Sequence, residues 1–386
     1  MPRVAPSSFR SPLPHSSRAA GRPAAPDQAD SALSATQARR EARWQALAQD
    51  KGVLARALWP VSVAYGALMA LRRSLYAAGW LTTHRLPVPV IVVGNVVVGG
   101  AGKTPTVIAL VQHLQAKGWH PGVVSRGHGR EHAEPVQVKV DTPLALSGDE
   151  PALIHRSTGA PVFVAAHRVD AARALLKAHP QTDVLICDDG LQHLAIGRDL
   201  SVVVFDDRGT GNGWLLPAGL LRDRWPPPGG GLGAPDFVLR QHREGGQPTA
   251  VPLPPRTPVF NATRRLSDEV IGARGEVLPM QALQGIPLTA VAGIARPAVF
   301  FDMLRARGLT LQDEVALPDH AVPAAYAALL AASPTTLICT EKDAVKLFQY
   351  AVPPGSAVWS VRLEVDIDPA FFGAVDARIS ALKAKP

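Results

Sequence analysis

The sequence predicts an α/β fold, in which a parallel sheet carries helices on both faces. The first observation behind this prediction is the alternation of short apolar β-type runs with helical segments from Val88 onward. The second is a Pro- and Gly-rich stretch at residues 225–235, which is expected to be a hinge or an exposed loop and after which a second, shorter alternating series begins. The third is a long apolar segment with tryptophan and tyrosine that precedes both. We therefore expect a smaller C-terminal α/β domain and an N-terminal membrane-associated helix in addition to the main sheet.

These observations divide the chain into four parts. Residues 1–45 are predicted to form a disordered tail, and residues 46–87 an N-terminal interfacial helix region. Residues 88–232 form the first α/β domain and residues 233–386 the smaller one.

Composition restricts the partners and the compartment. The only two cysteines, Cys187 and Cys339, each end an apolar run, which indicates buried strand thiols in a reducing compartment. The net charge of +8 suits a partner that carries phosphates. Aromatic residues make up only 5% of the chain and do not interleave with a basic stretch, so we expect a membrane surface and no nucleic acid.

The segment before the sheet has the composition of a membrane-surface helix. Residues 1–35 are rich in Ala, Pro and Ser and contain no apolar run of the kind found in secretory signals. Residues 57–81 are mostly apolar, but Arg72 and Arg73 interrupt them before the ~20 residues of a spanning helix are reached. This pattern favours a helix that lies in the headgroup region. The alternative is a core helix of the soluble domain.

The elements of the two α/β parts follow from apolar runs and their flanking turns. Strands of the first part are predicted at Val88–Val93, Pro121–Ser125, Pro161–Ala165, Asp183–Cys187 and Leu200–Phe205, with helices at Thr104–Lys117 and Val169–Ala178. In the second part, strands are predicted at Phe237–Arg240, Val259–Asn261, Leu288–Ala292 and Thr336–Cys339, with helices at Arg296–Arg307 and Val322–Ala332.

A glycine-rich turn between the first strand and the first helix is the strongest chemical signal. It reads Gly99-Gly100-Ala101-Gly102-Lys103-Thr104. Glycines let backbone N–H groups approach phosphate oxygens, and the helix N-terminus adds positive potential. Lys103 can reach the β- and γ-phosphates of a nucleotide, and Thr104 offers a hydroxyl to Mg²⁺. The match to the strict P-loop pattern is imperfect, because Val97 stands where that pattern has glycine.

Two carboxylates follow the buried strand that ends at Cys187. Asp188 and Asp189 lie at the carboxyl end of a predicted parallel strand, the edge at which nucleotides bind in such sheets. Carboxylates there are natural Mg²⁺ ligands, although a strand-ending turn with solvated aspartates would have the same sequence.

Three further polar clusters have simpler interpretations when each is taken alone. Residues 148–151 (Gly-Asp-Glu-Pro) could be a helix N-cap, residues 221–224 (Leu-Arg-Asp-Arg) a solvated surface run, and residues 318–320 (Pro-Asp-His) a turn. A Ser-His-Asp nucleophile elbow and a zinc-type histidine cluster are absent from the sequence.

Together these motifs resemble the tetraacyldisaccharide 4'-kinase family of the lipid A pathway. The resemblance covers roughly residues 50–350 and includes the arginine pair of the N-terminal helix. It rests on an ordered series at residues 93–95, 98–105, 125–130, 148–151, 188–193, 221–223, 318–320 and 340–343.

The resemblance implies a P-loop kinase-like fold and a reaction. The family uses ATP and Mg²⁺ to phosphorylate the 4'-hydroxyl of a tetraacylated glucosamine disaccharide 1-phosphate, a lipid A precursor. It acts at the cytoplasmic face of the bacterial inner membrane, so this chain is expected to be a lipid-sugar kinase attached to that surface.

The resemblance also implies roles for individual residues. Asp149 corresponds to the catalytic aspartate and His320 to its partner histidine. Because one precedes residues 225–235 and the other follows them, we expect the domains to close on the substrate. The remaining site residues are metal ligands (Thr104, Asp188, Asp189 and Asp223) and further active-site positions (Gln192, His193, Arg222 and Arg126).

Two positions depart from the family pattern. Val97 stands where Ser or Thr is frequent, and His128 where tyrosine is typical. We expect the first departure to cost a phosphate contact, and the second lies at a position that has a substrate-side role in the family.

Three competing functions remain open on the sequence. A partitioning-type ATPase would carry lysine at position 98, where this chain has Val98. A P-loop GTPase switch would carry a guanine-reading N-K-x-D motif, which residues 340–343 (Thr-Glu-Lys-Asp) match only faintly. A pure membrane-binding module would leave the acidic clusters without a role.

Overall fold

The computed structural model describes residues 48–127, 130, 132–228, 234–319, 321–332 and 336–383. The predicted tail at residues 1–45 lies outside the described residues, as do His128 and His320.

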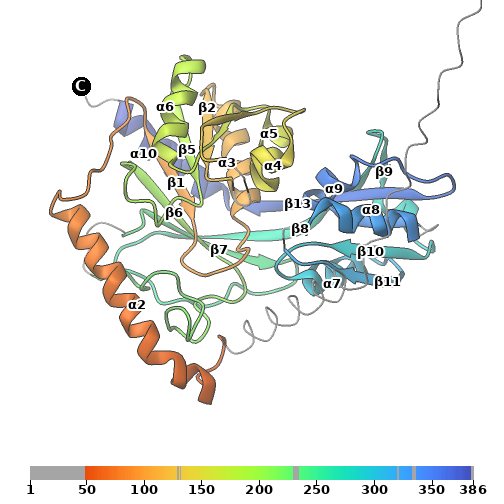
Figure 1. Ribbon diagram of the computed structural model, residues 1–386, viewed down its shortest axis with the longest axis horizontal. Coiled ribbons are helices and arrows are strands. Elements are labelled where there is room, and N and C mark those ends of the chain that lie inside the picture. Colours follow the sequence, from red (N-terminus) through yellow and green to blue (C-terminus); the bar gives the residue numbers. More distant parts are fainter. Residues whose placement is uncertain are drawn as a thin grey trace, which may run out of the picture.

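One continuous, mostly parallel sheet runs through the described chain (Figure 1). Its 13 strands follow the order β11-β10-β12-β13-β8-β7-β6-β1-β5-β2-β4-β3, with β9 paired to β8. Three pairs are antiparallel, namely β13 with β8, β3 with β4, and β8 with β9. The sheet is therefore mixed in pairing, while the parallel strands around β1 have the predicted arrangement.

The strands are short apolar runs between turns. Their bounds are β1 Val90–Gly94, β2 Pro121–Ser125, β3 Val136–Val138, β4 Val162–Val164, β5 Val184–Asp188, β6 Leu200–Phe205, β7 Phe237–Arg243, β8 Val259–Gly272, β9 Val277–Pro279, β10 Leu288–Ala292, β11 Leu311–Ala316, β12 Thr336–Thr340 and β13 Ala357–Ile367.

The helices follow the strands and cover both faces of the sheet. Their bounds are α2 Val53–Ala77, α3 Lys103–Ala116, α4 Leu144–Ser147, α5 Asp149–Thr158, α6 Arg168–Ala178, the 3₁₀ helix η1 Met280–Leu283, α7 Pro297–Ala306, α8 Pro323–Ala332, α9 Glu341–Leu347 and α10 Pro369–Lys383.

Alternation along β1 explains the two apolar layers. Ile91 and Val93 join a cluster with α3 and α10, while Val90 and Val92 join a second cluster with α6. Successive side chains of a strand point to opposite faces, so a strand that is apolar throughout requires cover on both sides. The prediction of helices on both faces is confirmed.

The two halves of the chain share one sheet through β7, β8 and β13. The predicted strand at Val259–Asn261 is the start of the much longer β8, and β13 pairs with it in antiparallel register. β13 and the following α10 were missed, because alternating Arg362, Glu364 and Asp366 dilute the apolar signal of the strand. The division into domains at residue 232 stays a prediction.

Helix α2 lies along one edge of the molecule (Figure 1) and is largely exposed. It is one helix of 25 residues that continues through Arg72 and Arg73, and it is long and apolar enough to cross a membrane. Only Ala55 and Ser62 are buried within it, so it is not the core helix of a soluble domain. Its exposed apolar residues are Val53, Leu54, Trp59, Val61, Val63, Leu68 and Leu71.

Candidate active site

The glycine-rich turn connects the carboxyl end of β1 to the first turn of α3. Gly99 and Gly102 both have positive φ, at 85° and 73°, a conformation that side-chain-bearing residues rarely adopt. Within the described chain, no protein acceptor receives the N–H groups of Gly99, Gly100, Ala101 or Gly102. These donors and the free N-terminal turn of α3 form a concave group of N–H dipoles that suits an anion.

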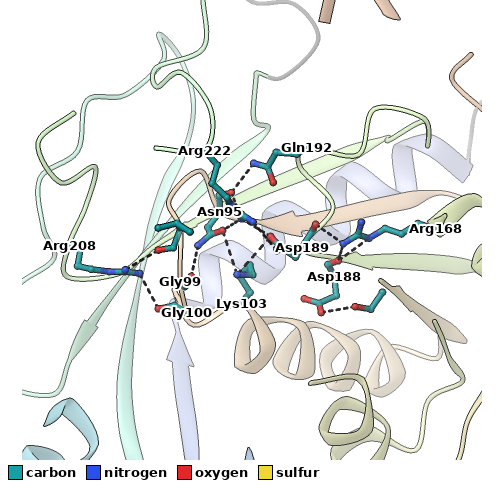
Figure 2. A network of polar contacts seen from close by, with 12 residues as sticks. Asn95, Gly99, Gly100, Lys103, Arg168, Asp188, Asp189, Gln192, Arg208 and Arg222 are labelled. Carbon is teal, nitrogen blue, oxygen red and sulfur yellow. Dashed lines mark hydrogen bonds and ion pairs between the residues drawn. The ribbon is translucent and has the colours of Figure 1, made fainter. Parts of the chain in front are cut away.

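Lys103 points into a polar network beside this turn (Figure 2). Its ammonium lies 3.5 Å from the Asn95 side-chain oxygen and 3.8 Å from the Asp189 carboxylate. Arg222 holds the same carboxylate through two hydrogen bonds of 2.8 and 3.0 Å. Burial alone would raise the pKa of Asp189, but Lys103 and Arg222 outweigh it and hold this pKa well below its usual range.

Asp188 has a different environment from its neighbour. It is buried at the end of β5, where one carboxylate oxygen accepts a 3.3 Å hydrogen bond from Ser125 and the other has no hydrogen-bond partner. Burial, with Glu150 and Asp189 nearby, raises the pKa of Asp188 to about 7. A buried carboxylate oxygen without a partner fits a cation, so the donor chemistry at Asp188 is compatible with Mg²⁺.

The four predicted metal ligands do not form one compact cluster. Among the residues that the structure describes, no group of three or more acidic, histidine or cysteine side chains is gathered for a metal. Asp223 is buried and ion-paired with Arg73 of α2, while Asp189 is held by Arg222. Thr104 is buried in the first turn of α3. Their shared role as metal ligands stays a prediction.

Asp149 opens α5 and faces the C-terminal half of the chain. Its carboxylate is 8% exposed and forms a 2.7 Å ion pair with the Lys346 ammonium of α9, which is 5% exposed. Lys346 also donates a 3.0 Å hydrogen bond to the Ala321 carbonyl oxygen. The predicted base is thus linked through Lys346 to Ala321 in the C-terminal half, and the interpretation of residues 148–151 as a mere N-cap does not account for this pair.

Three other predicted positions flank the network. Gln192 donates a 3.1 Å hydrogen bond to the Asn95 carbonyl oxygen, and its own carbonyl accepts one from Arg72. His193 is partly buried, and burial together with Arg168 lowers its pKa to about 4, so its ring is neutral near pH 7. Arg126 follows β2 and is exposed.

A cavity of 210 Å³ lies between the glycine-rich turn and the C-terminal half. Polar groups on one side, including Lys103 and Glu150, face an apolar wall on the other. The wall comes from β8, the loop between β10 and α7, α7 itself and β13, and it includes Leu266, Ile294, Val299, Phe300, Met303 and Leu363. One end can hold an anion, and the other a flat apolar ring.

Sequence reasoning gave no role to five residues that contact the site. Asn95 directly follows a strand, which is a usable signal, and Arg168 donates hydrogen bonds of 3.0 and 2.8 Å to the carbonyl oxygens of Asp188 and Asp189. Nothing in the local sequence marks the other three, because tertiary pairing brings them to the site; they are Arg208, Gln241 and Lys346.

Residues 54–380 match the family model described as tetraacyldisaccharide-1-P 4'-kinase. A tetraacyldisaccharide 4'-kinase of Acidovorax sp. (strain JS42) is 52% identical over 340 residues, which cover 87% of this chain and 94% of the relative. One of Polaromonas naphthalenivorans is 52% identical over 335 residues, which cover 86% and 93%. The crystal structure of LpxK from Aquifex aeolicus in complex with ATP matches with a TM-score of 0.70 at 25% identity, over 85% of this chain and all of that one.

Proposed function

Because this chain belongs to the tetraacyldisaccharide-1-P 4'-kinase family, we propose the following reaction for it. The enzyme transfers the γ-phosphate of ATP to the 4'-hydroxyl of a tetraacylated glucosamine disaccharide 1-phosphate, a step of lipid A biosynthesis. One structural observation at the candidate active site supports the proposal. The glycine-rich turn with Lys103 follows β1, and the buried Asp188 is the last residue of β5, the neighbouring parallel strand, where it pairs with Val93 of β1.

The cavity beside the glycine-rich turn suits ATP. The unpaired N–H groups of residues 99–102 and the Lys103 ammonium are donors for the β- and γ-phosphates. The apolar wall that includes Phe300 and Leu363 offers contact area to the adenine ring. In this binding mode the Lys103 ammonium leaves the Asp189 carboxylate and contacts the phosphates instead.

Magnesium is the cofactor that fits the acidic residues. Asp188, with an oxygen that lacks a hydrogen-bond partner, is the first candidate ligand, and Thr104, Asp189 and Asp223 are the others. When bound, Mg²⁺ would neutralise charge on the phosphates. Arg222 offers a further cation beside Asp189 that can compensate charge on the transferring group.

Asp149 is the proposed general base, with His320 as its partner. A base of this kind contributes roughly 10²–10⁴-fold to the rate by accepting the proton of the attacking hydroxyl. The ion pair with Lys346 orients the Asp149 carboxylate in the absence of the acceptor. Because Lys346 belongs to α9, movement between α5 and α9 would release the carboxylate toward the sugar hydroxyl.

The acceptor carries acyl chains, so the enzyme has to work at a membrane. The exposed side chains of α2, Leu68 and Leu71 among them, form an apolar surface. Other residues of α2 contact the site: Tyr65 donates a 2.8 Å hydrogen bond to the Arg222 carbonyl oxygen, and Arg73 pairs with Asp223. We propose that α2 holds the enzyme on the cytoplasmic face of the inner membrane, with its polar side toward the active site.

Transfer of labelled γ-phosphate tests the proposal directly. The purified protein is incubated with γ-labelled ATP, Mg²⁺ and micelles of the tetraacyl disaccharide 1-phosphate. We expect label in the lipid for the wild type and a loss of about 10²-fold or more in kcat/KM for Lys103→Ala. GTP replaces ATP in a parallel reaction. Strict use of GTP, or hydrolysis without labelled lipid, would instead favour a switch protein.

A further inference from the structure

The carbonyl oxygens of the glycine-rich turn are held by side chains from outside the turn. Arg208 donates hydrogen bonds of 3.0 Å to the Val98 carbonyl and 3.1 Å to the Gly100 carbonyl (Figure 2). Gln241 of β7 donates one of 3.1 Å to the Gly102 carbonyl. Three carbonyls of the turn are thereby fixed by two side chains that lie more than 100 residues away in the sequence.

Arg208 is itself held rigidly. Its Nε donates to both oxygens of Asp206 at 2.9 and 3.1 Å, and the Arg208 backbone N–H donates to Asp206 as well. The two side chains are 2% and 1% exposed. If the Arg208 guanidinium moved away, the buried Asp206 carboxylate would lose its partner, which is costly for a buried charge. The guanidinium therefore has little freedom to leave the carbonyls.

Gln241 is also buried and in close contact with the turn. Its amide nitrogen donates to the Thr106 hydroxyl at 2.7 Å in addition to the Gly102 carbonyl. A Cβ atom at position 102 would collide with the Gln241 amide, which gives a second reason, besides the positive φ, for glycine there.

Because the peptide bond is planar, a contact that fixes a carbonyl group also fixes the direction of the N–H group in the same peptide. In a planar trans peptide, the carbonyl of one residue and the N–H of the next point in opposite directions. Holding the carbonyls of Val98, Gly100 and Gly102 therefore directs the N–H groups of Gly99, Ala101 and Lys103 the opposite way. None of the N–H groups at residues 99, 101 and 103 has a protein acceptor in the described structure.

We propose that Arg208, held by Asp206, and Gln241 are positioning residues that keep the N–H groups of the glycine-rich turn directed at the phosphates of the nucleotide. They contact the turn and not the ligand. This inference rests on the proposed binding of ATP by the turn, but not on the identity of the acceptor.

The experiment compares the affinities of ATP and adenosine by titration calorimetry in the absence of lipid. Arg208→Lys keeps a charge beside Asp206 but cannot bridge two carbonyls, and Gln241→Met keeps the volume but removes the donor. In both variants we expect the Kd of ATP to rise about tenfold or more, because the misdirected N–H groups of the turn lose charge-assisted hydrogen bonds to the phosphates. The Kd of adenosine, which has no phosphate, should stay within about twofold.

Matched controls separate positioning from a general effect on folding. Arg265→Met removes an arginine that pairs with Glu364 at 2.6 Å, and Gln349→Met a glutamine that donates to the Val345 carbonyl. Neither contacts the turn, so both should bind ATP as the wild type does. Where Arg208→Lys does not fold, Asp206→Asn/Arg208→Leu, which removes both buried charges together, takes its place.

Two results would overturn the proposal. One is an unchanged Kd of ATP in the folded variants, and the other is an equal loss of ATP and adenosine affinity. A wild type that binds ATP but does not label the lipid would contradict the proposed function, but it would not change the interpretation of these variants.

In steady-state assays of the Arg208 and Gln241 variants, the KM for ATP should rise while the KM for the lipid stays constant.

Discussion

At the scale of single residues, two adjacent carboxylates have opposite electrostatic environments. Asp189 is paired with Lys103 and Arg222, whereas Asp188 is buried near Glu150 with one unpaired oxygen. Arrangements that push the pKa values of neighbouring groups apart are typical of catalytic sites. In the proposed function, Asp188 is therefore the group at which protons and Mg²⁺ would compete.

This competition predicts how Mg²⁺ affinity depends on pH. The pKa of Asp188 lies near 7. Below it the carboxyl is protonated, and Mg²⁺ has to displace that proton. The affinity for Mg²⁺ should then rise about tenfold per pH unit below pH 7 and level off above it. Titration of the nucleotide-free protein with Mg²⁺ between pH 5.5 and 8 measures this, and Asp188→Asn should abolish the dependence. A flat profile in the wild type would refute the assignment.

The same group makes the metal-free protein less stable as pH rises. The folded-state pKa of Asp188 is about 7, above its ordinary value of 3.8, so the folded state binds more protons than the unfolded state between these two values. The free energy of unfolding should fall with pH across that window and level off above pH 7. Urea denaturation of wild type and Asp188→Asn at several pH values checks the sign, since the variant should lack this contribution.

The Asp149–Lys346 pair gives a second prediction at this scale. Lys346→Met removes the ammonium that pairs with the buried Asp149 carboxylate, which should cost about 3–5 kcal/mol of stability. Because this ammonium orients the carboxylate, kcat should also fall by about tenfold or more. Asp149→Asn/Lys346→Met should recover most of the stability but not the activity.

The surface pair of Arg378 and Asp236 provides the control, because Arg378→Met should change neither the stability nor the activity. An unchanged kcat in Lys346→Met would contradict the role of this lysine.

At the scale of elements, α2 connects the proposed membrane surface to the active site. Leu68 and Leu71 are 62% and 56% exposed, while Arg72 and Arg73 contact Gln192 and Asp223. Leu68→Glu/Leu71→Glu should reduce binding to anionic vesicles by roughly tenfold or more, because two charges enter the apolar interface. Val277→Glu, at a similarly exposed residue of β9, is the control in the same sedimentation assay. Equal sedimentation of both variants would show that α2 does not carry the membrane contact.

Elements with a strong local signal were predictable from the sequence, and those that depend on distant pairing were not. The turn at residues 99–104 and the pair Asp188 and Asp189 follow apolar strands, so strand pattern and turn chemistry place them at one sheet edge. Trp225 shows the opposite case. It lies in a Pro-rich stretch predicted as a hinge or an exposed loop, yet it is buried against Phe205 and donates a 2.7 Å hydrogen bond to the Pro252 carbonyl. Only the folded chain brings these partners together.

At the scale of the whole molecule, the site is assembled from both halves of the chain. The turn, Asp188 and Asp149 come from the N-terminal half, and Lys346 and the apolar wall of the cavity from the C-terminal half. The contacts in such a composite site join residues that are far apart in the sequence, so local sequence patterns do not reveal them. This is why the ordered motifs indicated the family, whereas the residues that support them were found only in the structure. The expected closure of the halves stays a prediction, with the contact between α5 and α9 as the place where it would act.

The position of the new phosphate on the acceptor tests the central claim most directly. The lipid product formed from ATP by the wild type is isolated and examined by phosphorus–proton correlation NMR. We predict one new phosphate monoester, coupled to the proton at the 4' carbon, and no such product from Lys103→Ala or Asp149→Asn at equal protein concentration. A phosphate at another hydroxyl, or the same product in equal amount from Asp149→Asn, would contradict the account.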